Sequence, residues 1–207
     1  DPTAASHTWS VCASNAGIAL TCSDALTVDA PADACGWSGE VTALLQDGCD
    51  GALDLVVDGS YQVGVSPVVF SASDDLSNTA ECATALTVRD VTAPIAACGV
   101  VVGNVPAIIT AVASDACGAR VTLDGLVCTA LIDGVERTVT DCPVIIAGDT
   151  LRVAAHLPVG ELVVSYRVTA VDPTGLTTTV DCRQVLPADS DRDRDGVADG
   201  VDNCPEY

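Results

Sequence analysis

The chain has no lysine, no methionine and few aromatic residues. Without lysine, Schiff-base chemistry and Ser–Lys dyads are excluded, and so are the lysine–asparagine isopeptide bonds that rigidify some surface fibres. Aromatic residues make up only 3% of the sequence, so the hydrophobic core must consist of Val, Leu, Ile and Ala. Because such small side chains give thin layers, we expect disulfides to supply stability that packing alone does not.

Catalytic residue patterns are also scarce. The two histidines are His7 and His156, and we expect a structural or surface role for His156 on a strand. The sequence contains no G-x-S-x-G, no H-E-x-x-H and no glycine loop of the kind that binds phosphate. We therefore expect no enzymatic activity within these residues.

Positive charge is rare, with 8 Arg against 29 acidic residues and a net charge of −21. A basic surface for nucleic acid is missing, and an anionic membrane surface would repel the chain. No apolar run approaches the roughly 18–20 residues that span a bilayer. We expect no nucleic-acid partner and no membrane insertion.

Cysteine, by contrast, is abundant. Eleven cysteines without any C-x-x-C pair argue against zinc or thioredoxin-like chemistry and indicate an oxidising compartment. The sequence thus predicts a secreted, extracellular or cell-surface protein. The odd count means that at least one cysteine is free, pairs with another chain, or lacks its partner here.

Strand signals dominate the rest of the sequence. Residues 65–72 and 162–170 are rich in β-branched side chains, and residues 85–89 alternate apolar with polar. Asp-Gly turns recur between such segments, and no helical period is sustained. Short strands with turns every 8–12 residues or so predict an all-β fold of β-sandwiches.

An internal repeat predicts two such sandwiches in tandem. Residues 61–74 match 157–172, and each copy then reaches a turn, a polar strand and a cysteine, Cys82 or Cys182. The N-terminal stretch, residues 1–11, reads as extended. We expect it to be the first strand of its own domain, with addition to the sheet edge of a neighbouring molecule as the alternative.

The first copy also carries a family pattern: V-G-x-x-x-V-x-F-x-A-x-D at 63–74, N-x-A-x-C at 78–82 and D-x-T-A-P-I at 90–95. These motifs resemble the hyalin repeat (HYR) family, and the second copy matches it more weakly. The resemblance implies immunoglobulin-like sandwiches used in extracellular adhesion or as spacers, without catalytic activity. We expect domains at 1–90 and 91–187, the second with an insertion near 128–147.

The HYR resemblance further implies that early and late cysteines of each domain meet. The pairs implied in this way are Cys12 with Cys82 and Cys98 with Cys182. Two further pairs are expected, Cys128 with Cys142 to close the insertion and Cys22 with Cys35. The partners of Cys49, Cys117 and Cys204 remain unassigned.

The end of the sequence, residues 191–202, reads D-x-D-x-D-G-x-x-D-x-x-D, the ligand spacing of a calcium loop. A solvated acidic tail is the alternative. The expected ligands are Asp191, Asp193, Asp195, the Val197 carbonyl, Asp199 and Asp202. With the following D-N-C-P, residues 188–207 resemble a thrombospondin type 3 repeat, a family of calcium loops joined by disulfides.

Two other acidic turns are candidates for a second Ca²⁺ site. They are Asp74 and Asp75 with Asn78, and Asp172 with Thr174. An Asx turn that closes a hairpin is the favoured interpretation of both.

Taken together, these features predict an extracellular structural or adhesive protein that is disulfide-stabilised and binds Ca²⁺. Self-association, or binding to other surface proteins, would make it the repeating subunit of a surface filament or sheath. The alternatives are a ligand- or carbohydrate-binding surface module and a non-catalytic appendage of a larger secreted protein.

Overall fold

The computed structural model describes residues 5–11, 17–47, 51–102, 107–154 and 160–187. Every regular element in these ranges is a β-strand, so the predicted all-β fold is confirmed. Among the described residues there is no helix long and apolar enough to cross a membrane. The chain divides into two compact units, Asp1–Thr92 and Ala93–Tyr207, where the sequence predicts a division after residue 90.

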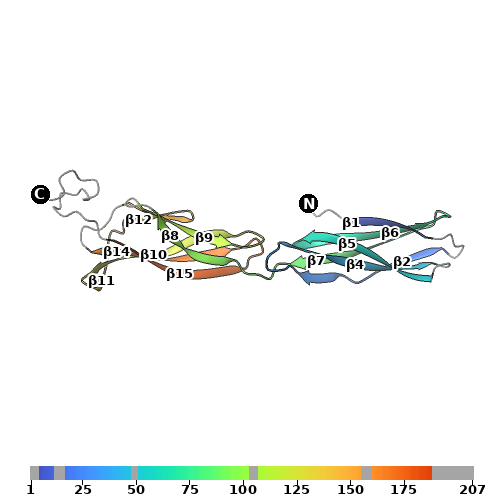
Figure 1. The fold of residues 1–207 in the computed structure, drawn as a ribbon, viewed down its shortest axis with the longest axis horizontal. Helices are drawn as coiled ribbons and strands as arrows, with labels where there is room; N and C mark the ends of the chain where they lie inside the picture. The colour runs from blue at the N-terminus through green and yellow to red at the C-terminus, as the bar shows by residue number, and fades with distance from the viewer. Residues whose placement is uncertain (1–4, 12–16, 48–50, 103–106, 155–159, 188–207) are drawn as a thin grey trace. The chain divides into compact units, whose positions relative to one another are not determined.

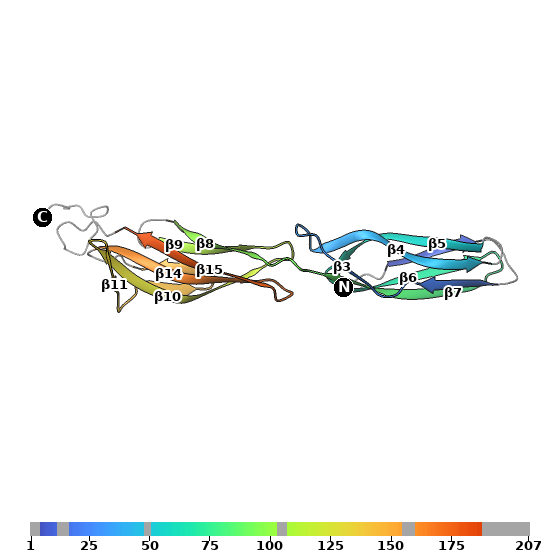
Figure 2. The same ribbon diagram turned by 90° about the horizontal axis from the view of Figure 1, so that it is seen from below.

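Unit 1 is a sandwich of two sheets. Its strands are β1 (Ala5–Val11), β2 (Ile18–Cys22), β3 (Leu26–Asp29), β4 (Gly36–Asp47), β5 (Gly51–Gln62), β6 (Gly64–Asp74) and β7 (Thr79–Arg89). One sheet has the order β1-β6-β7-β3 and the other β2-β4-β5. Figure 2 shows β4 and β5 in one layer and β6 and β7 in the other.

Most neighbouring strands of unit 1 are antiparallel, as expected for hairpins joined by short turns. Two pairs are parallel instead: β1 runs parallel to β6, and β3 runs parallel to β7. Both parallel strands lie at the edges of the same sheet, with the β6–β7 hairpin between them. Two edges of one sheet are thus formed by segments that precede this hairpin in the chain.

The core of unit 1 follows from strict alternation along its strands. In β6, Val68, Phe70 and Ala72 are buried while the residues between them are more exposed. They face Leu45 and Leu55 of the other sheet in one buried cluster. Each large side chain buried in this way contributes about 1.5–3 kcal/mol.

Unit 2 contains the remaining strands. They are β8 (Ile95–Val102), β9 (Ala107–Ser114), β10 (Arg120–Ile132), β11 (Val135–Thr138), β12 (Val144–Ala147), β13 (Thr150–Val153), β14 (Glu161–Val171) and β15 (Thr177–Leu186). The sheets have the orders β12-β13-β9-β8 and β11-β10-β14-β15. Labelled by position, these are D-E-B-A and C′-C-F-G, the arrangement of an immunoglobulin-like sandwich.

Each element of this second sandwich can be compared with the first. The antiparallel pairs β2–β4 and β4–β5 correspond to β8–β9 and β9–β13, and the hairpin β6–β7 corresponds to β14–β15. The segment predicted as an insertion, 128–147, contains the end of β10 with β11 and β12. Strands β10 to β12 have no counterpart between β4 and β5, which are separated only by residues 48–50.

Strand β1 occupies the position in unit 1 that β10 occupies in unit 2. It lies along β6 within unit 1, at the edge where β10 lies along β14 in unit 2 (Figure 1). In the single chain described here the N-terminal segment thus forms a strand of its own unit, as the sequence predicts. Its direction is reversed relative to β10, since β1 is parallel to its neighbour and β10 is antiparallel.

Candidate functional site

The predicted calcium loop falls outside the described residues. All six expected ligands belong to it: Asp191, Asp193, Asp195, Val197, Asp199 and Asp202. Cys12 lies outside the described residues as well. The functional features that the structure does describe are the disulfide framework and the two acidic turns at the ends of the hairpins.

The predicted disulfide between Cys98 and Cys182 is confirmed. It joins β8 of one sheet to β15 of the other, with the two Cα atoms 5.6 Å apart and a sequence separation of 84. A covalent link across the two layers of a sandwich restricts the unfolded chain most when the loop it closes is long. For this loop the effect is about 4.5 kcal/mol.

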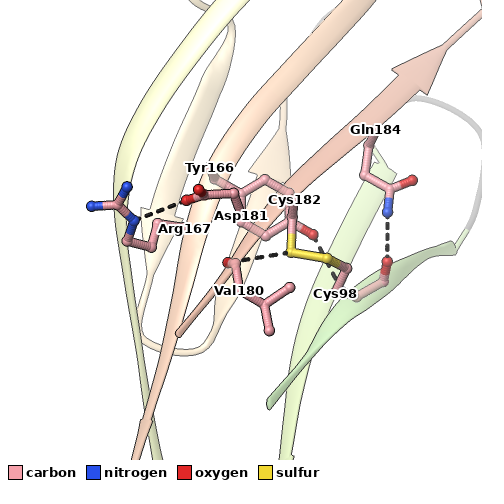
Figure 3. The surroundings of a disulfide bond; sticks show 8 residues. Cys98, Tyr166, Arg167, Val180, Asp181, Cys182 and Gln184 are labelled. Atoms are coloured by element: carbon pink, nitrogen blue, oxygen red, sulfur yellow. Dashed lines mark hydrogen bonds and ion pairs between the residues drawn. A yellow bond between two sulfur atoms is a disulfide. The ribbon is translucent and has the colours of Figure 1, made fainter. Parts of the chain in front are cut away.

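Hydrogen bonds reinforce this link between the layers (Figure 3). Strand β8 has a bulge between Ala97 and Val100, which turns the backbone of Gly99 away from the regular ladder. The Gly99 N–H donates to the Tyr166 hydroxyl at 3.3 Å, and Gln184 Nε2 donates to the Gly99 carbonyl at 2.8 Å. The bulge therefore leaves neither backbone group of Gly99 without a partner.

Only glycine fits at the centre of this bulge. A Cβ at position 99 would lie 2.6 Å from the carbonyl carbon of Thr110 and 2.7 Å from Cγ2 of Ile109. Backbone atoms of the neighbouring strand cannot move away without breaking the sheet. The glycine thus permits the close approach that the disulfide and the Tyr166 bond require.

Unit 1 has an equivalent bond between Cys22 on β2 and Cys82 on β7, with Cα atoms 5.7 Å apart. The equivalence extends to the register, because Cys82 pairs with Phe70 and Cys182 pairs with Tyr166 on the preceding strand. Both disulfides therefore join a strand of one sheet, β2 or β8, to the last strand of the unit, next to an aromatic residue of the core. The two copies of the internal sequence repeat therefore share the same disulfide position and the same strand register.

This geometry corrects two predicted pairs. Cys82 bonds to Cys22, so the pair Cys12–Cys82 is wrong, and so is Cys22–Cys35. The reason is that β2, which pairs with β4 as β8 pairs with β9, is the strand equivalent to β8. Cys12 instead follows β1 in the chain, and β1 belongs to the same sheet as β7 rather than to the sheet that contains β2.

The predicted pair Cys128–Cys142 is confirmed. It ties the buried end of β10 to the segment just before β12, and the Val139 N–H donates to the Cys128 carbonyl at 3.1 Å. Cys35 and Cys117 are also in disulfide bonds, so all eight cysteines in the described ranges are oxidised. Stable disulfides of this number are typical of proteins outside the reducing cytosol.

The turn between β14 and β15 is organised by Asp172, whose residue is 5% exposed. Its Oδ1 accepts hydrogen bonds from the Thr174 N–H and the Thr174 hydroxyl, both at 2.8 Å, and from the Leu176 N–H at 3.0 Å. Its Oδ2 is buried and has no hydrogen-bond partner among the described residues. The favoured interpretation, an Asx turn, is confirmed here.

Asp74 organises the β6–β7 turn in the same way. Its Oδ1 accepts from the N–H groups of Leu76 and Asn78 at 2.9 and 2.8 Å, and its Oδ2 accepts from Asn78 Nδ2 at 2.7 Å. Both carboxylates therefore hold their own backbone at the same place in the two repeats. Their chemical role in the described structure is to close hairpins.

Burial and hydrogen bonding oppose each other at Asp172. Burial raises the pKa of its carboxyl, but the bonds from Thr174, Leu176 and Gly175 together outweigh it, so the net pKa lies below the ordinary value. Since the folded pKa is depressed, the carboxylate stabilises the fold above the unfolded pKa. This contribution is lost as the pH falls through the folded pKa.

One of the positions at which the two turns differ yields a test. Ser77 has a φ of 64°, whereas the equivalent residue of the second turn is Gly175 with a φ of 94°. Because a left-handed backbone is unfavourable for residues with a Cβ, we expect Ser77→Gly to stabilise unit 1 by about 0.5–1 kcal/mol. Calorimetric unfolding measures the change.

The reciprocal variant is the control. A Cβ at Gly175 would meet no atom within 4 Å, so Gly175→Ser changes only the backbone preference. We expect it to destabilise unit 2 by a similar amount. Destabilisation by Ser77→Gly would contradict the argument.

Comparisons with known proteins do not assign a family. No protein-family model and no curated protein matches the chain. Among solved structures, the chain is similar to a crystal structure of BcpA, described as the major pilin subunit of Bacillus cereus. That match has 10% identity and a TM-score of 0.23, and it covers 84% of this chain and 69% of that chain.

Proposed function

We propose that this chain is an extracellular structural protein and that its tandem sandwiches are the repeating unit of a surface filament or sheath. The observation that carries the proposal is the equivalent disulfide in each sandwich, Cys22–Cys82 and Cys98–Cys182. Each bond links the two layers of its unit, and each unit has its own buried core. Modules stabilised in this way resist unfolding and proteolysis outside the cell.

The described surface fits a mechanical role better than a chemical one. The two acidic turns use their carboxylates to hold backbone, and the described cysteines are oxidised. Neither group is then available as a nucleophile or general base. The absence of enzymatic activity is part of the proposal.

Calcium binding by residues 191–202 completes the proposal and rests on the spacing of the carboxylates. Five aspartates within one short loop would repel one another without a cation. A bound Ca²⁺ would order this loop and stiffen the connection that follows the second sandwich.

The calcium part has a direct test. Titration calorimetry with Ca²⁺ should register binding to the full chain, and Asp193→Ala with Asp195→Ala should abolish it, because alanine offers no side-chain oxygen at these two ligand positions. Asp54→Ala, at an exposed aspartate on β5, is the matched control and should bind as the parent does. No heat of binding in the parent chain would contradict this part.

The assembly part is tested by light scattering and electron microscopy of the same samples. We expect end-to-end oligomers in Ca²⁺ that become shorter when a chelator is added. A chain that stays monomeric at high concentration with Ca²⁺ present would remove the filament proposal.

A further inference from the structure

Unit 1 has an incomplete sheet without β1. In unit 2 the strand beside β14 is β10, which lies between β9 and β13 in the chain. Unit 1 has no such strand between β4 and β5, so nothing in its β2–β7 portion pairs with the outer edge of β6. An unpaired strand edge is a template for another strand.

In the structure that edge is covered by β1. The two strands pair over seven positions, from Ala5 opposite Val68 to Val11 opposite Asp74. The Trp9 ring stacks on Phe70 with centroids 5.7 Å apart, and it packs against the core of unit 1. The strand therefore contributes both backbone pairing and a large apolar side chain to the sandwich.

Strand β1 is the edge strand of its sheet, and among the described strands its backbone pairs with β6. Both Cys22 and Cys82 follow it in the chain, so β1 lies outside the loop that their disulfide closes. The disulfide-linked sandwich would remain closed if β1 were to leave.

The charges of the two strands permit pairing between separate copies. The chain as a whole carries a net charge of −21, which opposes most contacts between copies. Strand β1 contains no acidic residue, and β6 contains only Asp74, at its end. Pairing between β1 of one copy and β6 of another therefore brings few negative charges together, although the two chains as a whole repel each other.

We infer that β1 is exchanged between molecules: the β6 edge of unit 1 binds the β1 strand of a second copy of this chain. This inference rests on the proposed function and specifies how its subunits connect. The exchanged strand makes the same contacts as the chain's own strand, so the exchange adds little cost beyond bringing two copies together. Donor strand and acceptor edge are different surfaces, so the contact can propagate from copy to copy.

The test places a photoreactive benzophenone amino acid at Trp9, where an aromatic ring already contacts Phe70. An unlabelled (¹⁴N) and a ¹⁵N-labelled preparation are mixed in denaturant without reductant. They are then refolded together at rising protein concentration in the presence of Ca²⁺, and irradiated. Mass spectrometry of the β1–β6 products then shows whether both strands come from one copy. The same probe at Ser10, opposite Ser73 in the register, replaces it if the Trp9 variant does not fold.

The matched control carries the probe at Thr27 in β3, the parallel strand at the other edge of the same sheet, opposite Thr87. Because β3 follows the disulfide-bonded Cys22, it stays with its own unit. Its products should contain one isotope only. For the β1 probe in assembled protein we expect as many mixed-isotope products as same-isotope products.

The outcomes separate the inference from the function on which it rests. Assemblies whose β1–β6 products contain one isotope only would overturn strand exchange and leave the filament subunit intact. Monomers with one-isotope products at every concentration would overturn both.

Discussion

Removal of the Cys22–Cys82 disulfide should lower the free energy of unfolding of unit 1 by about 4 kcal/mol, because the bond closes a loop of 60 residues. The variant is Cys22→Ala with Cys82→Ala, which leaves no single thiol to mispair. Small domains are stable by only about 5–15 kcal/mol, so a loss of this size removes a large share of the total. Denaturant unfolding followed by tryptophan fluorescence measures it.

The position of the tryptophans supplies an internal control. Trp9 and Trp37 are the two tryptophans of the chain, and both belong to unit 1. The equivalent variant of unit 2, Cys98→Ala with Cys182→Ala, should therefore leave the tryptophan transition where it is and shift only the circular dichroism signal of unit 2. A unit 1 variant that unfolds at the parent's denaturant concentration would refute the structural role of the bond.

Truncation of the largest fully buried side chain should have a similar effect. Phe70 is fully buried and contacts Trp9, so Phe70→Ala leaves a cavity and removes the stacking of β1. The expected cost is about 3–5 kcal/mol on unit 1. The same tryptophan transition reports it, and a shift of the Trp9 emission towards that of exposed indole should accompany it.

Val65→Ala is the control on the same strand. Val65 is 60% exposed, so its truncation should change stability by no more than about 0.5 kcal/mol. Equal effects of the two substitutions would show that the alternation of buried and exposed residues along β6 is not what stabilises unit 1.

The disulfide pairs show which contacts the sequence alone can predict. Cys98–Cys182 and Cys128–Cys142 were predicted correctly, the first from a family resemblance and the second from the limits of one segment. Cys12–Cys82 was wrong because the position of a cysteine in the chain does not show which sheet its strand joins.

The Asx turns were predictable for a different reason. A short acid at a hairpin end bonds to its own backbone within four residues, so the sequence around Asp74 and Asp172 contains all the atoms involved. The bond from the Gly99 N–H to the Tyr166 hydroxyl was not predicted. Its donor and acceptor are 67 residues apart, and no local pattern connects them.

The sequence by itself determined the features that depend on neighbouring residues: strands from alternation, turns from Asp-Gly and Asx patterns, the absence of lysine chemistry, and a repeated all-β unit in an oxidising compartment. Only the tertiary structure decided that Cys22 meets Cys82 and that β1 lies parallel to β6. The physical reason is that parallel strands are not joined by a tight turn, so their pairing leaves no signal in the residues between them. Such pairs form because the rest of the sandwich has an unpaired strand edge and an apolar surface, and the added strand covers both.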